Sequence, residues 1–230
     1  MSRTYVIYYG WLTADQLGAP NQVARAIAAA KVPLLVAHYW TAPPERHKNL
    51  SSPVLSLLQG AGTEVFAYVA TNWGNAESGA VESAVSEYLE AGVDGIFFDE
   101  SDALVSEARL QYYERLARLI RDQGGKIILN PGVSRCGERI MRVADRIMLE
   151  HDWRDFSVQS PWMRRYAPAR FMGVSSNEGN ALGYLVDEQR ALADTREAWQ
   201  CGIGWHTSTN RYIELPEWFG SYVQGVSATV

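Results

Sequence analysis

The sequence predicts a single (β/α)8 barrel that spans residues 1–230 as one catalytic domain. Three observations lead to this fold class. Short apolar runs of strand length recur eight times, helix-like stretches separate them, and glycines stand where several helices give way to the next strand. Strands that are buried on both faces and alternate with helices form a parallel sheet, and eight such units in about this length favour a closed barrel.

The expected strands are located by their apolar residues. The clearest helix between them runs from Leu104 to Leu119, where apolar side chains recur at helical spacing. An open doubly wound sheet is the alternative, but Tyr9-Gly10-Trp11 stands where a dinucleotide-binding fold would have a Gly-x-Gly-x-x-Gly motif. The eight expected strands are Thr4–Tyr9, Pro33–His38, Val65–Ala70, Asp94–Phe98, Lys126–Asn130, Arg146–Glu150, Ala169–Val174 and Gly202–His206.

Composition narrows the classes of function and partner. The net charge of −5 argues against nucleic acid, whose binding depends on Lys and Arg. Cys136 and Cys201 lack the spacing of metal ligands. The chain shows neither a signal peptide nor a membrane-spanning run, so we expect no membrane partner. We also expect a monomer. The compartment stays open: cytoplasmic as the chain stands, secreted if a signal was removed.

Aromatic and polar residues gather at the expected carboxyl ends of the strands, where barrels of this kind place their active sites. Five of the eight tryptophans fall there. Aromatic rings pack against the C–H face of a sugar, whereas carboxylate, amide and imidazole groups bind its hydroxyls. We therefore expect a polysaccharide or oligosaccharide substrate, bound by Tyr8, Trp11, His38, Trp40, Asn72, Trp73, Asn130, His151, Trp153, Trp205 and His206.

Carboxylates at two strand ends indicate the chemistry. Asp99 and Glu100 follow one strand, and Glu150 ends the next strand but one. Backbones two strands apart lie ~9 to 10 Å from each other, so inward side chains reach the roughly 5 to 9 Å between the two acids of a glycosidase. Because side chains alternate along a strand, we expect only one of Asp99 and Glu100 to face Glu150. These three are the predicted catalytic residues, with no cofactor and no metal.

Two other functions stay open. His38, His151 and His206 all stand at expected strand ends, and with a carboxylate they could hold a metal ion for hydrolysis or deacetylation. A catalytically silent barrel that only binds sugar polymers would keep the tryptophans but need no carboxylate pair. Asp99→Asn and Glu150→Gln distinguish the two cases, since they would abolish turnover in a hydrolase but only weaken binding in a silent barrel.

The chain resembles the spherulation-specific family 4, or spherulin-4-like, proteins, which include glycoside hydrolase family 135. The resemblance rests on the string Asp94-Gly95-Ile96-Phe97-Phe98-Asp99-Glu100, with support from Gly74, Asn130-Pro131-Gly132 and Glu150. It implies a (β/α)8 barrel that cleaves α-1,4-linked galactosamine or N-acetylgalactosamine polymers, such as galactosaminogalactan, within the polymer chain. Similarity to related retaining barrels implies that Asp99 is the nucleophile, Glu150 the general acid and Glu100 an assisting group, although the first two roles could be exchanged.

Overall fold

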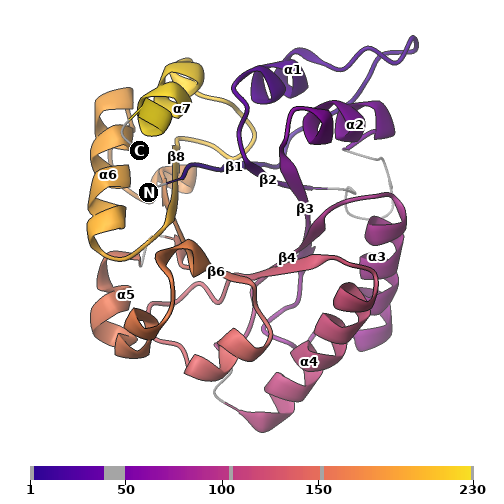
Figure 1. Ribbon diagram of the computed structural model, residues 1–230, viewed down its shortest axis with the longest axis vertical. Coiled ribbons are helices and arrows are strands. Elements are labelled where there is room, and N and C mark those ends of the chain that lie inside the picture. The colour runs from indigo at the N-terminus through magenta and orange to yellow at the C-terminus, as the bar shows by residue number, and fades with distance from the viewer. Residues whose placement is uncertain (1–2, 39–49, 104–105, 151–152, 229–230) are drawn as a thin grey trace.

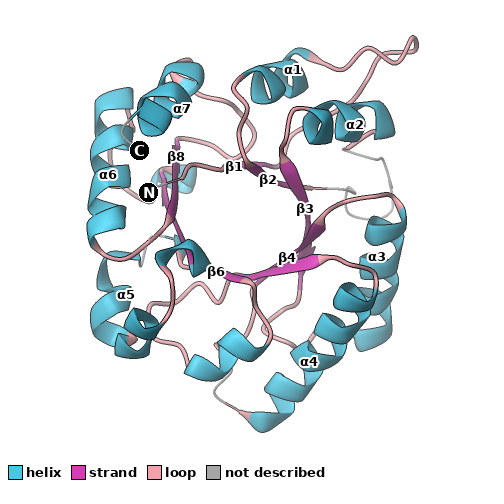
Figure 2. Ribbon diagram, in the orientation of Figure 1, coloured by secondary structure: helices cyan, strands magenta, loops and turns pink. Residues whose placement is uncertain are grey.

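The computed structural model describes residues 3–38, 50–103, 106–150 and 153–228, and these form one eight-stranded sheet in chain order. Neighbouring strands are parallel from the first to the eighth. Helices surround this ring of strands (Figures 1 and 2). The strands are β1 (Val6–Tyr8), β2 (Leu34–Ala37), β3 (Glu64–Ala70), β4 (Gly95–Asp99), β5 (Lys126–Leu129), β6 (Arg146–Met148), β7 (Phe171–Ser176) and β8 (Trp205–Thr209).

Several helices begin at side chains that cap them. Asn21, Ser106 and Asp187 each accept a hydrogen bond from a backbone N–H in the first turn of the helix that follows. Within the described residues, no helix combines the length and the apolar character needed to cross a membrane. The helices are α1 (Gln22–Ala29), α2 (Ser52–Gly60), α3 (Ser78–Glu90), α4 (Glu107–Asp122), α5 (Trp153–Gln159), α6 (Glu188–Gln200) and α7 (Phe219–Ala228), with 3-10 helices η1 (Glu138–Arg142), η3 (Pro161–Arg165), η4 (Pro168–Arg170) and η5 (Glu178–Asn180).

The ring of strands closes through Arg3, which forms a parallel bridge with Trp205. The Arg3 N–H donates to the Gly204 carbonyl at 3.0 Å, and the Arg3 carbonyl accepts from the His206 N–H at 2.9 Å. Backbone hydrogen bonds thus join the two ends of the sheet. The predicted (β/α)8 barrel is confirmed.

The last strand begins three residues later than the sequence predicts. Gly202 follows α6 with a φ of +86°, and a Cβ at Gly204 would lie 2.5 Å from the backbone of Pro168. These glycines therefore serve the helix-to-strand turn and a close backbone approach. As a result Trp205 and His206 begin β8 instead of ending it.

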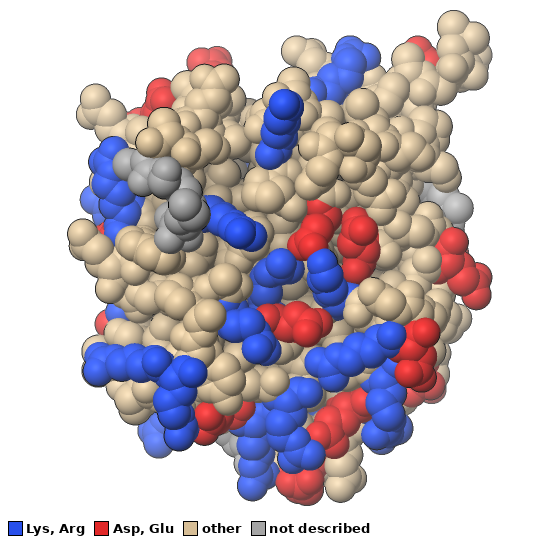
Figure 3. All heavy atoms as spheres, in the orientation of Figure 1, with Lys and Arg blue, Asp and Glu red and all other residues tan. Residues whose placement is uncertain are grey.

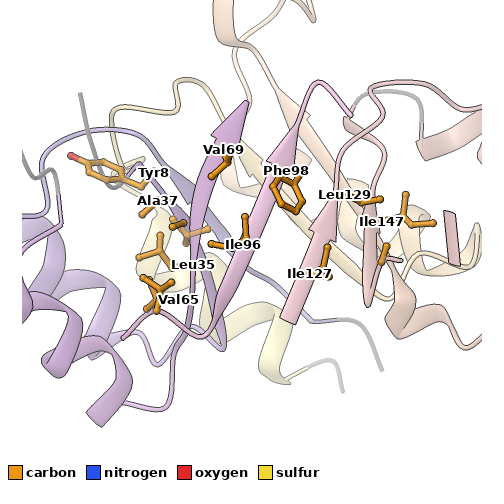
Figure 4. Packing of buried hydrophobic residues seen from close by; sticks show 14 of the residues in the cluster. Tyr8, Leu35, Ala37, Val65, Val69, Ile96, Phe98, Ile127, Leu129 and Ile147 are labelled. Atoms are coloured by element: carbon orange, nitrogen blue, oxygen red, sulfur yellow. The ribbon is translucent and has the colours of Figure 1, made fainter. Parts of the chain in front are cut away.

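Side chains alternate between the barrel interior and the space beneath the helices. Figure 4 shows part of the outer layer, including Leu35, Val65 and Ile96 on the adjacent strands β2, β3 and β4. Tyr8 belongs to this outer layer and is buried, whereas Tyr9 packs against the interior cluster. The prediction that Tyr8 binds substrate is wrong, because the alternation turns its ring toward the helices.

Trp205 closes the amino end of the barrel, opposite the predicted site. Its ring is 2% exposed and lies beneath the guanidinium groups of Arg146, at 4.9 Å, and Arg3, at 5.3 Å. Arg146 is also paired with Glu64 at 3.1 Å. Figure 3 shows acidic and basic side chains interspersed on one face of the barrel. The prediction that Trp205 binds substrate is therefore wrong, because the ring is a buried plug at the start of its strand.

Candidate active site

A cleft of about 420 Å³ lies at the carboxyl ends of β3, β4, β5 and β6. It brings together residues that are separated by up to 77 positions in the sequence, between Trp73 and Glu150. All three predicted catalytic carboxylates line it, so the structure places them together, while their catalytic role stays a prediction. The lining consists of Trp73, Asp99, Glu100, Asn130, Pro131, Gly132, Val133 and Glu150.

Asn130 connects two of the carboxylates. Its Nδ2 donates to Asp99 Oδ1 at 2.7 Å and to Glu150 Oε1 at 2.8 Å, and its Oδ1 accepts from the Gly132 N–H at 3.0 Å. The two carboxylate oxygens therefore lie no more than about 5.5 Å apart, the sum of their distances to the shared nitrogen. Asn130 is only 1% exposed, and its two N–H groups are engaged by the two acids. It also lines the cleft, and its role in binding substrate stays a prediction.

Asp99 accepts further hydrogen bonds. The Glu100 N–H donates to Asp99 Oδ1 at 2.9 Å, and the Tyr68 hydroxyl also bonds to the Asp99 carboxylate. Burial and the negative charge of Asp99 raise the pKa of Tyr68 far above its usual range, so its hydroxyl keeps the proton that it donates. Together with Asn130, these donors hold the Asp99 carboxylate in one orientation.

Four rings form the wall of the barrel mouth beside Asp99. The Tyr9 ring lies 4.7 Å from His38, 5.2 Å from Tyr68 and 5.4 Å from Tyr212, and His38 lies 4.5 Å from Tyr68. Burial lowers the pKa of His38, and the charge of Asp99 partly opposes this effect. The imidazole is therefore neutral near pH 7. His38 was predicted to bind substrate, and its place in the mouth is compatible with that role.

Sequence reasoning missed Tyr9, Tyr68 and Tyr212. Tyr9 and Tyr68 could have been found from the strand period, because each stands two positions after an interior residue, Ile7 and Phe66 respectively. Tyr212 lies in the loop after β8, and no pattern in the sequence marks it as an interior residue.

Left-handed backbone conformations are concentrated around the cleft. Positive φ angles occur at Asn72 (46°), Trp73 (51°), Glu100 (47°) and Glu150 (43°), all of which are non-glycine residues after strands. Such conformations are unfavourable for residues with a Cβ and recur at functional sites. At Glu100 the positive φ ends the strand alternation, which is why Asp99 and Glu100 both line the cleft. Of these two acids only Asp99 is bridged to Glu150 through Asn130, and the expectation that only one of them faces Glu150 stays a prediction.

Two other predicted binding residues lie on exposed loops near the mouth. Trp11, after β1, is 50% exposed, and its carbonyl accepts a hydrogen bond from Asn21 Nδ2. Asn72 is exposed beside Trp73, whose ring is 52% exposed. Neither Trp11 nor Asn72 lines the cleft itself. Trp40 and His151 fall outside the described residues.

His206 and Trp153 are fully buried, away from the cleft. His206 Nδ1 is 3.0 Å from Thr195 Oγ1, and its Nε2 is 3.2 Å from Ser175 Oγ. Burial, with a contribution from the positive charge of Arg154, lowers the pKa of His206 to about 3. The prediction that His206 and Trp153 bind substrate is wrong, since His206 faces the helical layer and Trp153 packs at the start of α5.

The structure separates two of the histidines that the alternative metal site would need. His38 lies in the barrel mouth, but both ring nitrogens of His206 are occupied by hydroxyl groups beneath α6. In the part of the chain that the structure describes, no group of three or more His, Cys, Asp or Glu side chains could hold a metal ion. His151, the remaining member, lies outside that part.

A (β/α)8 barrel with clustered carboxylates and aromatic rings at the carboxyl ends of its strands has the arrangement typical of glycoside hydrolases. The chain belongs to the spherulation-specific family 4, whose sequence profile matches residues 42–226. This match confirms the resemblance noted in the sequence. A comparison with curated proteins finds no match.

Solved structures share the fold at low sequence identity. Sph3 from Aspergillus clavatus, in complex with GalNAc, has a TM-score of 0.72 and 16% identity, covering 98% of this chain and 97% of that one. A chitinase from Chromobacterium violaceum has a TM-score of 0.62 and 13% identity, covering 99% of both chains. The glycoside hydrolase domain of PelA from Pseudomonas aeruginosa has a TM-score of 0.56 and 13% identity, covering 92% of this chain and 96% of that one.

Proposed function

We propose that this protein is a glycoside hydrolase that cleaves polysaccharides of galactosamine or N-acetylgalactosamine. The observation that carries the proposal is the spacing of Asp99 and Glu150, whose bridged oxygens lie no more than about 5.5 Å apart. Retaining glycosidases hold their carboxyl groups about 5 to 5.5 Å apart, and inverting enzymes roughly 6.5 to 9.5 Å apart. The spacing supports a retaining mechanism.

The hydrogen bonds support a division of roles between the two acids. Asp99 accepts from Asn130, Glu100 and Tyr68, which holds its carboxylate in one orientation and suits a nucleophile. Among the described residues, Glu150 accepts one hydrogen bond, at Oε1, which leaves Oε2 able to carry a proton. In this mechanism Glu150 protonates the leaving oxygen while Asp99 attacks the anomeric carbon. Glu150 then deprotonates the water that releases the sugar.

The charge and shape of the cleft support an amino-sugar polymer. Three carboxylates and no Lys or Arg stand among the described lining residues, and this favours a neutral or cationic sugar over an acidic one. Trp73 presents an exposed ring at the cleft, and Trp11 presents another on the loop after β1, which supports contact with several sugar units and cleavage within the polymer. Membership of the spherulation-specific family 4 and the GalNAc complex of Sph3 agree with this substrate class.

The test is incubation of the purified protein with α-1,4-galactosaminogalactan, polygalactosamine and a chitin-like polymer, with product sizes measured by mass spectrometry. We expect oligosaccharides from the galactosamine-containing polymers. Asp99→Asn and Glu150→Gln should each lower the rate at least about 1000-fold, because each removes a group that reacts with the substrate. Glu90→Gln is the matched control, since this glutamate is exposed at the end of α3.

The rival function is sugar binding without turnover. If the wild-type protein binds the polymers but releases no product from any of them, the hydrolase proposal fails. If the carboxamide variants lose only affinity, the carboxylates bind sugar without catalysing its cleavage.

A further inference from the structure

Two buried residues outside the cleft are linked to the backbone of Glu100: Thr71 contacts it directly, and Tyr113 contacts Thr71. Thr71 follows β3, Tyr113 belongs to α4, and both are fully buried. Thr71 Oγ1 lies 2.7 Å from the Tyr113 hydroxyl, 3.0 Å from the Glu100 carbonyl oxygen and 3.1 Å from that of Asp99. Neither side chain lines the cleft. Their contacts therefore reach the site through the main chain that carries its acids.

The available hydroxyl protons decide which group donates and which accepts in each of these hydrogen bonds. The Tyr113 hydroxyl accepts from the Asp102 N–H at 3.1 Å, so its own proton is free to donate to Thr71 Oγ1. Burial raises the pKa of Tyr113 to about 12, so that proton is present at any working pH. Thr71 then donates to the Glu100 carbonyl. The hydrogen bonds run from Asp102 through Tyr113 and Thr71 to the backbone of Glu100.

The backbone of Glu100 needs such support because its φ is +47°. A residue with a Cβ reaches this left-handed region only at a cost in free energy, and it stays there when surrounding contacts hold it. The Glu100 carbonyl also accepts from the N–H of Trp73, which itself has a φ of 51°. Two strained residues of the cleft thus depend on one carbonyl group. Thr71 and Trp73 together satisfy it.

We infer that Thr71 and Tyr113 are positioning residues, which keep Glu100 in its left-handed conformation and thereby hold its carboxylate in the cleft beside Asp99. The inference rests on the proposed function for its catalytic consequence. In an extended backbone, Glu100 would continue the strand alternation, and its side chain would turn toward the helices. The hydroxyl chain prevents this outcome.

Single-group substitutions test the inference. Thr71→Val and Tyr113→Phe each remove a hydroxyl with little change in shape, and we expect either to lower kcat about tenfold while KM for the polymer changes less than twofold. Thr71→Ser keeps the hydroxyl and should restore at least half of the wild-type kcat. Tyr112→Phe is the matched control, because the neighbouring Tyr112 hydroxyl is buried without a partner among the described residues.

Crystal structures of the wild type and of Tyr113→Phe separate this inference from the proposed function. We expect the variant to show an extended Glu100 with its carboxylate outside the cleft, or two alternative conformations. A Glu100 that stays left-handed in the cleft, together with an unchanged kcat, would overturn the inference. If the wild-type protein hydrolyses no polymer, the proposed function fails, and the two structures still decide whether the hydroxyl chain holds Glu100. If Thr71→Val does not fold, Tyr113→Phe and Thr71→Ser supply the comparison.

Discussion

Asp99 and Glu150 accept hydrogen bonds from the same nitrogen, Nδ2 of Asn130. One neutral amide thus fixes the separation of two carboxylates that would otherwise repel each other. The amide is itself oriented by the Gly132 N–H, which donates to its Oδ1. The pair is therefore organised before any substrate binds, which removes the entropic cost of orienting the two acids during the reaction.

Asn130→Asp should lower kcat about 100-fold. The substitution keeps the shape of the side chain but replaces a double donor with a third acceptor, so Asp99 and Glu150 lose their bridge and face another negative charge. Steady-state kinetics on the best polymer measures the effect, and circular dichroism confirms that the variant is folded. A folded variant with wild-type kcat would show that the bridge does not contribute to catalysis.

Tyr68→Phe should lower kcat about tenfold. The reason is that the Asp99 carboxylate loses the hydroxyl group that bonds to it, so it is held less firmly in the position from which it acts. Steady-state kinetics of wild type and variant measure the effect, with Tyr112→Phe as the control. A folded variant with wild-type kcat would show that this hydrogen bond does not contribute to catalysis.

Stability should decrease as the pH falls below about 6.5, because of His206. Its pKa of about 3 in the folded protein is lower than in the unfolded chain, so below the unfolded pKa only the unfolded state binds the proton. The contribution is fully present above pH 6.5 and is lost toward pH 3, at a rate approaching roughly 1.4 kcal/mol per pH unit. Urea unfolding between about pH 7 and pH 5 measures it, and His206→Gln should show a shallower slope. Equal slopes would exclude His206 as the source.

Trp73→Ala should weaken substrate binding, whereas Trp205→Ala should lower the stability of the fold. Trp73 is 52% exposed at the cleft, so its loss should raise KM about tenfold, or ~1.4 kcal/mol, with little change in the free energy of unfolding. Trp205 is 2% exposed at the other end of the barrel, and its loss should lower that free energy by about 3 to 5 kcal/mol. Kinetics and denaturant unfolding of both variants check this contrast. A large rise in KM for a folded Trp205→Ala protein would contradict the assignment.

Apolar runs and helical spacing predicted the barrel correctly, because buried strands and amphipathic helices are recognisable from local patterns. The same patterns located the three acids of the cleft, since a strand that ends in charged residues brings them to the barrel mouth. Three of the misplaced residues have one of two causes. Tyr8 was assigned to the wrong side of its strand, and Trp205 and His206 were assigned to the wrong end of theirs.

The sequence by itself determined the fold class, the family and the strand ends that carry Asp99, Glu100 and Glu150. The tertiary structure decided which polar groups meet there. The bridge through Asn130 and the hydroxyl chain from Tyr113 join residues 20 to 42 positions apart in sequence, and their existence depends on strand register and helix packing. Local propensity carries no information about such contacts, because they arise only when distant strands and helices are brought side by side.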